Sequence, residues 1–433
     1  MKESMGAMNN EARSTIRGLI FDSGGVLIRT VTPTPRRDLE RRYGLPEGGV
    51  DALVFDHALW QEAQLGHITS AEFWERIGQE LGLGAGETAE FRQAFWSGDR
   101  LDSELLALIQ ALHGAGYRTG LLSNAPADFR QSVDQMMPGT FEPVVVSGCE
   151  GMMKPSPEIF ALTLERAGLR PEETVFVDDF RENVTAACRL GMHGLWFRGA
   201  APLRRDLRAL GLPAPDPVIA SVEGIRAVIF DWSGVMERSA DSTYCAQWEQ
   251  RLNVAPGTLP GVLWGAECHL LEVGAISLDE FGEHVARRLN LTSPEAGRKF
   301  VDEFYTTDWL NDSVVAAARA LRSRYKTALL SNAFPGQPEW LRDQYDLDLE
   351  AEFDVYINSA EVGLRKPDPA IYTLTLDRLG LAPEAAVLLD DMLRNVDVAH
   401  ALGMHALQFV DPTISLPQLE ALLGHKIGGN PAD

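Results

Sequence analysis

Short apolar runs alternate along the chain with longer segments in which apolar residues recur every three or four positions. The runs GLIF (18–21), TGLL (119–122) and TVFV (174–177) contain no charged residue, which is typical of strands buried on both faces of a parallel sheet. The segments 102–116 and 313–325 have the spacing of amphipathic helices. Strand followed by helix, several times over, predicts an α/β fold with a doubly wound parallel sheet. The ligand site of such a sheet lies at the carboxyl ends of its strands.

This pattern occurs twice. Four segments of the first half recur in the same order in the second half, displaced by 209 residues at the first pair and by 212 at the last. The matched segments are GLIFDSGGVL (18–27) and AVIFDWSGVM (227–236), TGLLSNAP (119–126) and TALLSNAF (327–334), GMMKPSPEIF (151–160) and GLRKPDPAIY (363–372), and 175–197 and 387–409. A displacement this constant indicates two copies of one domain.

Between the first and second matched segments, each copy has roughly seventy residues with a helical pattern, which predicts a helical cap inserted over the strand ends. We expect the first domain at 16–212 with its cap at about 30–98, and the second at 224–426 with its cap at about 239–308. A Pro-rich linker, 213–223, would join them. Residues 1–15 are expected to be disordered, and 427–433 to form a polar tail.

The composition limits the partners. The chain has 62 acidic and 39 basic residues, a net charge of −23, which argues against a nucleic acid but not against a small anion in a local pocket. No stretch approaches eighteen uninterrupted apolar residues, and the first fifteen lack the apolar part of a signal peptide, so we expect no membrane partner. Four cysteines without CxxC spacing fit a reducing compartment, and we expect a cytoplasmic protein. The oligomeric state is left open.

The candidate chemistry lies at the strand ends. Asp22 and Asp231 each follow the first strand of a copy, where a carboxylate can be a nucleophile, a metal ligand or both. The alternative is an Asp that only caps the next turn.

A Ser-Asn pair ends another strand in each copy, at Ser123 and Asn124 and at Ser331 and Asn332. A hydroxyl and the following backbone N–H can hold an anionic oxygen there, although such a pair can also be an ordinary helix N-cap.

Lysine is scarce: the chain has six, and 33 of its 39 basic residues are Arg. Two of the six, Lys154 and Lys366, fall at matched positions before Pro. A compact ammonium group can bridge a nucleophilic carboxylate and a phosphoryl oxygen, which a planar guanidinium does less well.

Adjacent carboxylates end a further strand in each copy, as Asp178 and Asp179 and as Asp390 and Asp391. Like charges this close are costly unless a cation compensates them. Together with Asp22 or Asp231 they form an oxygen-rich set that suits Mg²⁺.

The order FDxxGV, LLSN, KPxPxI and DDxxxNVxxAxxLGM, present in both halves, resembles the haloacid dehalogenase-like (HAD) hydrolase superfamily. The subfamily resembled has a helical cap between its first and second motifs. The resemblance covers nearly the whole chain, twice. It implies two Rossmann-like cores and Mg²⁺-dependent phosphoryl transfer through an aspartyl-phosphate. We expect the substrate to be a small phosphorylated or otherwise anionic metabolite.

The resemblance also implies roles for matched residues. Asp22 and Asp231 would be nucleophiles and metal ligands, and Lys154 and Lys366 the lysines of the third motif. Ser123 and Ser331 would bind phosphate. The other metal ligands would be Asp179 and Asp391, with Asp178 and Asp390 beside them, and the backbone carbonyls of Gly24 and Ser233. Asn183 and Asn395 stand where many relatives have another Asp.

The chain departs from the family at Gly24 and Ser233, where most phosphatases have a second Asp that protonates the leaving group and activates water. Such assistance is worth roughly 10²–10⁴-fold in rate. A phosphatase is the favoured interpretation. The alternatives are a 2-haloacid dehalogenase, an enzyme that ionises allylic diphosphates, or non-catalytic ligand-binding domains; one of two copies without activity is also compatible with the sequence.

Four arginines in the first cap, Arg36, Arg37, Arg41 and Arg42, are interpreted as a solvated helix face.

Overall fold

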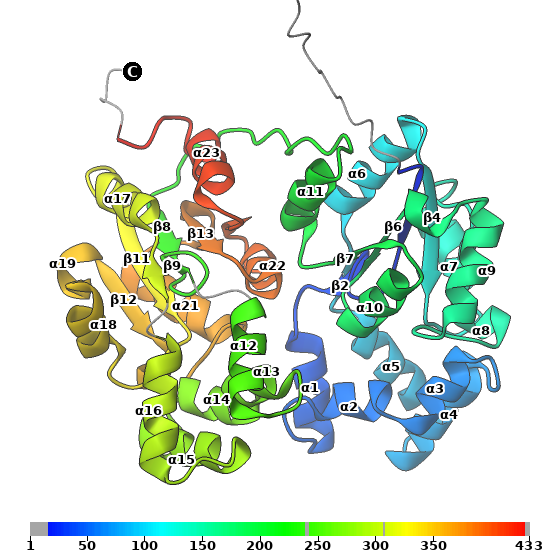
Figure 1. Ribbon diagram of the computed structural model, residues 1–433, viewed down its shortest axis with the longest axis horizontal. Helices are drawn as coiled ribbons and strands as arrows, with labels where there is room; N and C mark the ends of the chain where they lie inside the picture. The colour runs from blue at the N-terminus through cyan, green and yellow to red at the C-terminus, as the bar shows by residue number, and fades with distance from the viewer. Residues whose placement is uncertain (1–15, 239–241, 306–307, 429–433) are drawn as a thin grey trace, which may run out of the picture. The chain divides into compact units, whose positions relative to one another are not determined.

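The computed structural model of the protein describes residues 16–238, 242–305 and 308–428. The chain divides into two compact units, Met1–Pro217 and Val218–Asp433 (Figure 1). The segment 1–15, residues 239–241 and 306–307 of the second cap, and all but the start of the tail lie outside the described residues.

Unit 1 contains a five-stranded sheet with the strand order β5-β4-β1-β6-β7, and every neighbouring pair in it is parallel. The strands are β1 (Gly18–Phe21), β4 (Arg118–Ser123), β5 (Val144–Val146), β6 (Thr174–Asp178) and β7 (His193–Trp196). Phe21 pairs with Leu121 on one side and Val177 on the other, so the carboxyl ends of three strands meet at one edge. The predicted doubly wound parallel sheet is confirmed.

Helices flank this sheet. They are α6 (Ser103–Gly114), α7 (Phe129–Met136), α8 (Ser147–Glu150), α9 (Pro157–Ala167), α10 (Arg181–Arg189) and α11 (Ala200–Ala209), with a 3₁₀ turn at Pro171–Glu173. Their ends follow from local chemistry. Asp102 accepts a hydrogen bond from the backbone of Leu105 (2.8 Å) and so caps the first turn of α6. Gly168 ends α9 in the left-handed conformation, which costs glycine little.

The cap of unit 1 is formed by five helices, and an antiparallel ribbon of two short strands connects it to the core. The helices are α1 (Thr34–Tyr43), α2 (Gly49–Phe55), α3 (Ala58–Gln64), α4 (Ser70–Glu80) and α5 (Ala85–Trp96), and the ribbon strands are β2 (Ile28–Thr30) and β3 (Asp99–Leu101). The cap has its own apolar core, which includes Phe73, Trp74 and Phe95.

Unit 2 repeats the arrangement with the parallel strand order β12-β11-β8-β13-β14. Its strands are β8 (Ala227–Phe230), β11 (Lys326–Ser331), β12 (Val355–Asn358), β13 (Ala386–Asp390) and β14 (His405–Gln408). Its core helices are α17 (Asp312–Leu321), α18 (Gln337–Tyr345), α19 (Leu349–Glu352), α20 (Ser359–Val362), α21 (Pro369–Leu379), α22 (Leu393–Ala401) and α23 (Pro412–Leu423), with a 3₁₀ turn at Pro383–Ala385.

Both faces of the second sheet are covered, because alternate side chains of a strand point to opposite sides. Val228 and Phe230 of β8 pack with residues of α17, α18 and α23. Ala227 and Ile229 pack with residues of α21 and α22. Figure 1 shows this helix–sheet–helix layering. The second cap contains α12 (Ser242–Leu252), α13 (Thr258–Leu263), α14 (Ala266–Glu272), α15 (Leu278–Arg288) and α16 (Pro294–Tyr305), with ribbon strands β9 (Glu237–Arg238) and β10 (Trp309–Leu310).

In each unit one cap loop approaches the core closely, at a glycine. A Cβ atom on Gly66 (φ +75°) would lie 2.2 Å from the carbonyl oxygen of Gly148, and one on Gly274 (φ +68°) would lie 2.3 Å from that of Ala360. Polar contacts accompany the approach. Gln64 Nε2 donates to the carbonyl oxygen of Asn124 (2.9 Å) in unit 1. In unit 2, Arg365 forms an ion pair with Glu272 (2.8 Å), so each cap is tied to a loop that carries a site motif.

Arg36 does not lie on a solvated face, so that interpretation of the arginine cluster was wrong for this residue. Its side chain is buried against the ring of Phe95, and it forms ion pairs with Asp51 and with Asp99 (3.0 Å). The pairing with Asp99 links α1 to β3, which helps to hold the cap at its connection to the core.

None of the helices among the described residues is both long and apolar enough to span a bilayer.

Candidate active site

A buried lysine joins two carboxylates at the carboxyl edge of the first sheet. The Nζ atom of Lys154 lies 2.8 Å from Oδ1 of Asp22 and 2.7 Å from Oδ2 of Asp178. Asp22 follows β1, and its backbone N–H donates to the carbonyl oxygen of Val177, which continues the pairing with β6 by one residue. The three side chains predicted from separate motifs therefore meet in one place, and Lys154 is 2% exposed rather than a surface loop residue.

The carboxylate of Asp178 accepts hydrogen bonds from three groups. Besides Lys154, the amide of Asn183 donates to both of its carboxylate oxygens (3.1 Å each), and the backbone N–H of Phe180 donates to Oδ1 (2.8 Å). An Asp in place of Asn183 would supply no such donor at neutral pH. The departure from the family pattern at this position thus has a local reason, because the amide stabilises a carboxylate that is fully buried.

The side chain of Asn124 fixes the loop that carries the lysine. Its Nδ2 donates to the carbonyl oxygen of Lys154 (2.9 Å), and its Oδ1 accepts from the backbone N–H of Lys154 (2.8 Å). The amide is therefore committed to the main chain of the third motif. The phosphate contact that we expect at Asn124 would therefore be made by its backbone N–H, next to the hydroxyl of Ser123 at the end of β4.

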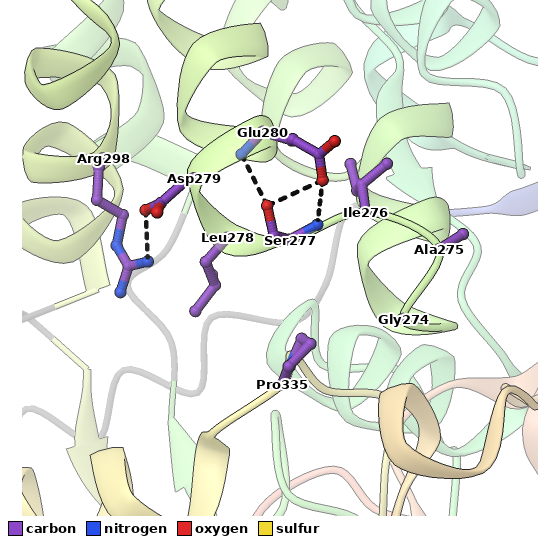
Figure 2. A pocket seen from close by; sticks show the side chains of 9 residues that line it. All are labelled: Gly274, Ala275, Ile276, Ser277, Leu278, Asp279, Glu280, Arg298 and Pro335. Atoms are coloured by element: carbon purple, nitrogen blue, oxygen red, sulfur yellow. Dashed lines mark hydrogen bonds and ion pairs between the residues drawn. The ribbon is translucent and has the colours of Figure 1, made fainter.

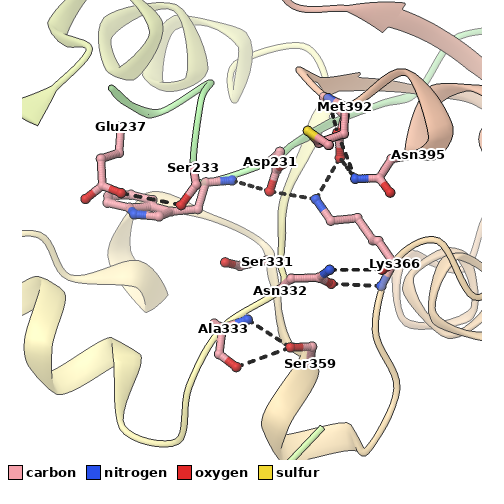
Figure 3. A network of polar contacts seen from close by, with 12 residues as sticks. Asp231, Ser233, Glu237, Ser331, Asn332, Ala333, Ser359, Lys366, Met392 and Asn395 are labelled. Atoms are coloured by element: carbon pink, nitrogen blue, oxygen red, sulfur yellow. Dashed lines mark hydrogen bonds and ion pairs between the residues drawn. The ribbon is translucent and has the colours of Figure 1, made fainter. Parts of the chain in front are cut away.

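Unit 2 has the same arrangement (Figure 3). Lys366 Nζ lies 2.6 Å from Asp231 Oδ1 and 2.7 Å from Asp390 Oδ2. Asn395 donates to both oxygens of Asp390 (2.9 and 3.1 Å), and Asn332 makes two 2.8–2.9 Å hydrogen bonds with the main chain of Lys366. The two copies retain one geometry around the lysine, which points to a shared chemical requirement.

The electrostatics of the site favour a cation. Burial raises the pKa of Asp22 to about 7, although Lys154 acts in the opposite direction. Burial, with Asp178 as the next cause, raises the pKa of Asp179 to about 6, and the equivalent Asp391 is raised to about 7. Burial opposes the charge of Lys154, but Asp22 and Asp178 outweigh it and raise the pKa of the ammonium group. One lysine thus compensates only part of three clustered carboxylates.

The same carboxylates fit a hard divalent ion. Oxygens of Asp22, Asp178 and Asp179 lie within 4.8 Å of one another, as do those of Asp231, Asp390 and Asp391. Oδ1 of Asp179 is buried without a hydrogen-bond partner, which is costly for a carboxylate oxygen unless a cation binds it. A carboxylate cluster of this kind is the ligand type that Mg²⁺ prefers.

A glycine in each unit leaves room for the second carboxylate. A Cβ atom on Gly25 (φ +75°) would lie 2.0 Å from Oδ2 of Asp179, and one on Gly234 (φ +82°) would lie 2.5 Å from Oδ2 of Asp391. Both the backbone conformation and the contact require glycine here. The turn after the proposed nucleophile therefore packs directly against the second carboxylate of the acidic pair.

The two units differ where the family has its second Asp. A Cβ atom on Gly24 would meet nothing within 4 Å, so unit 1 has open space at this position. In unit 2, Ser233 directs its hydroxyl to Oε2 of Glu237 (3.5 Å), and Tyr345 donates to Oε1 of the same carboxyl (2.9 Å). Burial raises the pKa of Glu237 to about 7. Glu237 was not predicted as a site residue, because Ile28 stands at the matched position of unit 1 and the two copies therefore share no residue there.

A hollow of about 500 Å³ in unit 2 lies between the cap and the loop after β11 (Figure 2). It is lined by Gly274–Glu280, Arg298 and Pro335. Ser277 and Glu280 in its wall bond to each other in a capping box that starts α15. The lining does not include Asp231, Ser331 or Lys366, so this hollow is not formed by the residues around the buried lysine.

The haloacid dehalogenase-like hydrolase model matches both halves of the chain, whereas each relative named below aligns with less than half of it. The family model of the haloacid dehalogenase-like hydrolases matches residues 16–191 and 225–403. The sesquiterpene phosphatase astK of Aspergillus oryzae is 31% identical over 200 residues, which are 46% of this chain and 97% of that protein. Drimenol cyclase drtB of Aspergillus calidoustus is 27% identical over 209 residues, which are 46% of this chain and 37% of that protein.

Acyl-CoA dehydrogenase family member 10 of Mus musculus is 32% identical over 212 residues, but the chain covers only 19% of that protein. A solved structure of a HAD family enzyme from Bacteroides thetaiotaomicron, a magnesium complex, aligns with 44% of this chain and 95% of its own, at 20% identity and a TM-score of 0.38. Because the family model covers most of both halves, the chain belongs to the haloacid dehalogenase-like hydrolases and contains two copies of their domain.

Proposed function

We propose that the protein is a Mg²⁺-dependent phosphatase of a small phosphorylated metabolite, with Asp22 and Asp231 as nucleophiles. The observation that carries the proposal is the buried lysine that bridges the nucleophile and the first Asp of the acidic pair, at 2.6–2.8 Å in both units. A lysine kept at this place in each copy neutralises charge where an anionic substrate would meet a carboxylate.

In the proposed reaction, a carboxylate oxygen of Asp22 attacks phosphorus, and the P–O bond to the leaving group breaks with its electron pair on that group. In both units the lysine and the next backbone N–H contact Oδ1 of the nucleophile, at 2.6–2.8 Å. These contacts support Oδ2 as the oxygen that would attack. Water then attacks the phosphorus of the aspartyl-phosphate, and inorganic phosphate leaves as the carboxylate is restored.

Other residues of the chain would hold the substrate. The hydroxyl of Ser123 or Ser331 and the backbone N–H of the following Asn would donate to phosphoryl oxygens. The metal ligands would be Asp22, Asp179 and the carbonyl of Gly24, with Asp231, Asp391 and the carbonyl of Ser233 in unit 2; Asp178 and Asp390 hold the lysine beside them. Bound Mg²⁺ supplies positive charge that stabilises the phosphoryl oxygens during transfer.

The proposed substrate class is supported by the charge of the chain and by its relatives. A net charge of −23 disfavours polyanions, whereas the lysine and a metal ion would attract one small anion locally. Isoprenoid phosphates are the first class to test, because one relative that the chain covers almost completely is named a sesquiterpene phosphatase. We also propose that the protein is cytoplasmic. This location is supported by its four cysteines, none of which forms a disulfide.

The direct test is hydrolysis of p-nitrophenyl phosphate with Mg²⁺ by the full chain. We expect the wild type to exceed the double variant Asp22→Asn/Asp231→Asn by at least about 10²-fold, and EDTA to remove the difference. Equal rates for the two proteins would refute the proposal. The two single variants measure how much of the total activity each copy contributes, and they show whether one copy is inactive.

A second candidate is ionisation of an allylic diphosphate, which breaks a C–O bond and needs metal but little general acid. It is favoured by the absence of a carboxyl group at Gly24 and Ser233 and by similarity to a protein named drimenol cyclase. Incubation with farnesyl diphosphate separates the two: ionisation releases diphosphate and a hydrocarbon or alcohol, whereas a phosphatase releases inorganic phosphate in single steps.

A further inference from the structure

The phosphate-binding serines of the two copies have different neighbours. In unit 2, Nε2 of Gln337 donates to Oγ of Ser331 (3.3 Å), and Gln337 is 3% exposed. The first residue of the corresponding helix in unit 1 is Phe129, which follows Ser123 at the same spacing of six residues. A phenyl ring has no hydrogen-bond donor, so the serine of unit 1 lacks this donor at the matched position.

A second contact sets the orientation of the glutamine amide. The hydroxyl of Tyr356 on β12 donates to Oε1 of Gln337 (2.8 Å), and burial raises the pKa of Tyr356, which keeps it a neutral donor. With Oε1 occupied in this way, the NH₂ end of the amide faces Ser331. A hydroxyl that accepts from this amide keeps its own proton for another acceptor.

We propose that Gln337 is a positioning residue that makes Ser331 a hydrogen-bond donor to the phosphoryl group, so that unit 2 binds phosphate more tightly than unit 1. The inference rests on the proposed function, since it assigns Ser331 to the bound anion. Ser331 ends β11, next to β8, whose following residue is Asp231 (Figure 3). A donor fixed before the substrate arrives loses no orientational freedom on binding, which is the physical gain that Tyr356 and Gln337 provide.

The test uses full-length protein in an Asp22→Asn background, so that turnover comes from unit 2. Gln337→Leu removes the donor, and Gln337→Glu keeps the shape and the acceptor for Tyr356 but draws the proton of Ser331 toward itself. We expect both to raise KM and the inhibition constant of inorganic phosphate by roughly two- to tenfold, with Glu the larger, and kcat to change by less.

A double-variant comparison separates positioning from general packing. In an Ser331→Ala background, Gln337→Leu should leave the inhibition constant of phosphate unchanged, because its effect passes through the missing hydroxyl. Phe129→Leu in an Asp231→Asn background is the matched control for the same helix position in unit 1, and it should leave phosphate inhibition unchanged.

An unaltered phosphate inhibition constant in Gln337→Leu, or a rise of equal size in the Ser331→Ala background, would overturn the inference. Its failure differs from that of the proposed function, which is refuted when the wild type turns over no faster than the double nucleophile variant. The rise in Tm caused by inorganic phosphate with Mg²⁺ needs no turnover. This rise in Tm therefore tests the inference even without turnover. Gln337→Leu should reduce the rise, and an equal rise in the variant and in the protein with Gln337 would contradict the inference.

Discussion

Lys154 Nζ lies 2.8 Å from Asp22 Oδ1, and both side chains are buried. The ion pair Lys426–Glu420 is as short, at 2.7 Å, but 79% of the Lys426 side chain is exposed. The two ion pairs are similar in length but differ in their contact with water, and Lys154 also contacts Asp178 (2.7 Å).

Lys154→Met should destabilise unit 1 by about 3–5 kcal/mol, because it leaves buried carboxylates without their cation. The loss should be largest in EDTA, since a bound divalent ion would replace part of the missing charge. Lys426→Met is the control, with an expected change within about 0.5 kcal/mol. Urea unfolding of both variants measures these effects, and equal losses would show that burial of the Lys154 pair has no special role.

Gly25→Ala should weaken Mg²⁺ binding about tenfold or more, because the new methyl group would displace the carboxylate of Asp179. Gly44→Ala is the control. Gly44 also has a positive φ, of 67°, but its Cβ would meet nothing within 4 Å. Both variants should lose about 1 kcal/mol of stability from backbone strain, whereas only Gly25→Ala should change the Mg²⁺ dependence of activity. A Mg²⁺ titration of both, with unchanged affinity in Gly25→Ala, would disprove the assigned fit.

The metal-free protein should become less stable between about pH 4 and 7. Folded Asp22, with its pKa raised to about 7, and Asp179, raised to about 6, keep protons that the unfolded chain releases near pH 4. The unfolded state therefore binds fewer protons in this window, and stability falls as pH rises.

Mg²⁺ needs the ionised carboxylates, so the rise in Tm that it causes should be larger at pH 8 than at pH 5. The variant Asp22→Asn/Asp231→Asn should show a smaller rise and a weaker pH dependence. Thermal unfolding with Mg²⁺ and with EDTA at both pH values checks this, and a Mg²⁺ effect independent of pH would count against the site.

Gly24→Asp should restore a general acid in unit 1, because the position has open space for a side chain. Alkyl phosphates, which need protonation of the leaving oxygen, should gain up to about 10²-fold, and p-nitrophenyl phosphate much less. The ratio of the two rates in an Asp231→Asn background measures the gain. An unchanged ratio would mean that a different group already supplies the proton.

The repeated strands and motifs were predictable because both copies preserve them. Apolar runs without charged residues predicted three strands of each sheet. The matched polar residues at the ends of these strands predicted the side chains that meet around Lys154 and Lys366. The edge strand β5 and the ribbons β2–β3 and β9–β10 were not predicted, since each of these strands has only two or three residues and no period to detect.

Other features were not predictable because their signal lies in partners distant in the sequence. Arg36 belongs to a cluster of arginines in the sequence, and its partner Asp99 lies 63 positions away, so the pattern near Arg36 does not indicate that it is buried. Glu237 and Gln337 occur in one copy only, so comparison of the halves could not reveal them. Their burial and their hydrogen bonds to Ser233 and Ser331 appear only in three dimensions.

The most direct measurement is mass spectrometry of the full chain, quenched in acid during turnover of p-nitrophenyl phosphate with Mg²⁺. Because Gly24 and Ser233 supply no carboxyl group to activate water, the phosphorylated intermediate should accumulate. We predict one added phosphoryl group on a peptide containing Asp22 or Asp231, absent from the matching Asn variant. Turnover without phosphate on either aspartate, or with phosphate on a different residue, would contradict it.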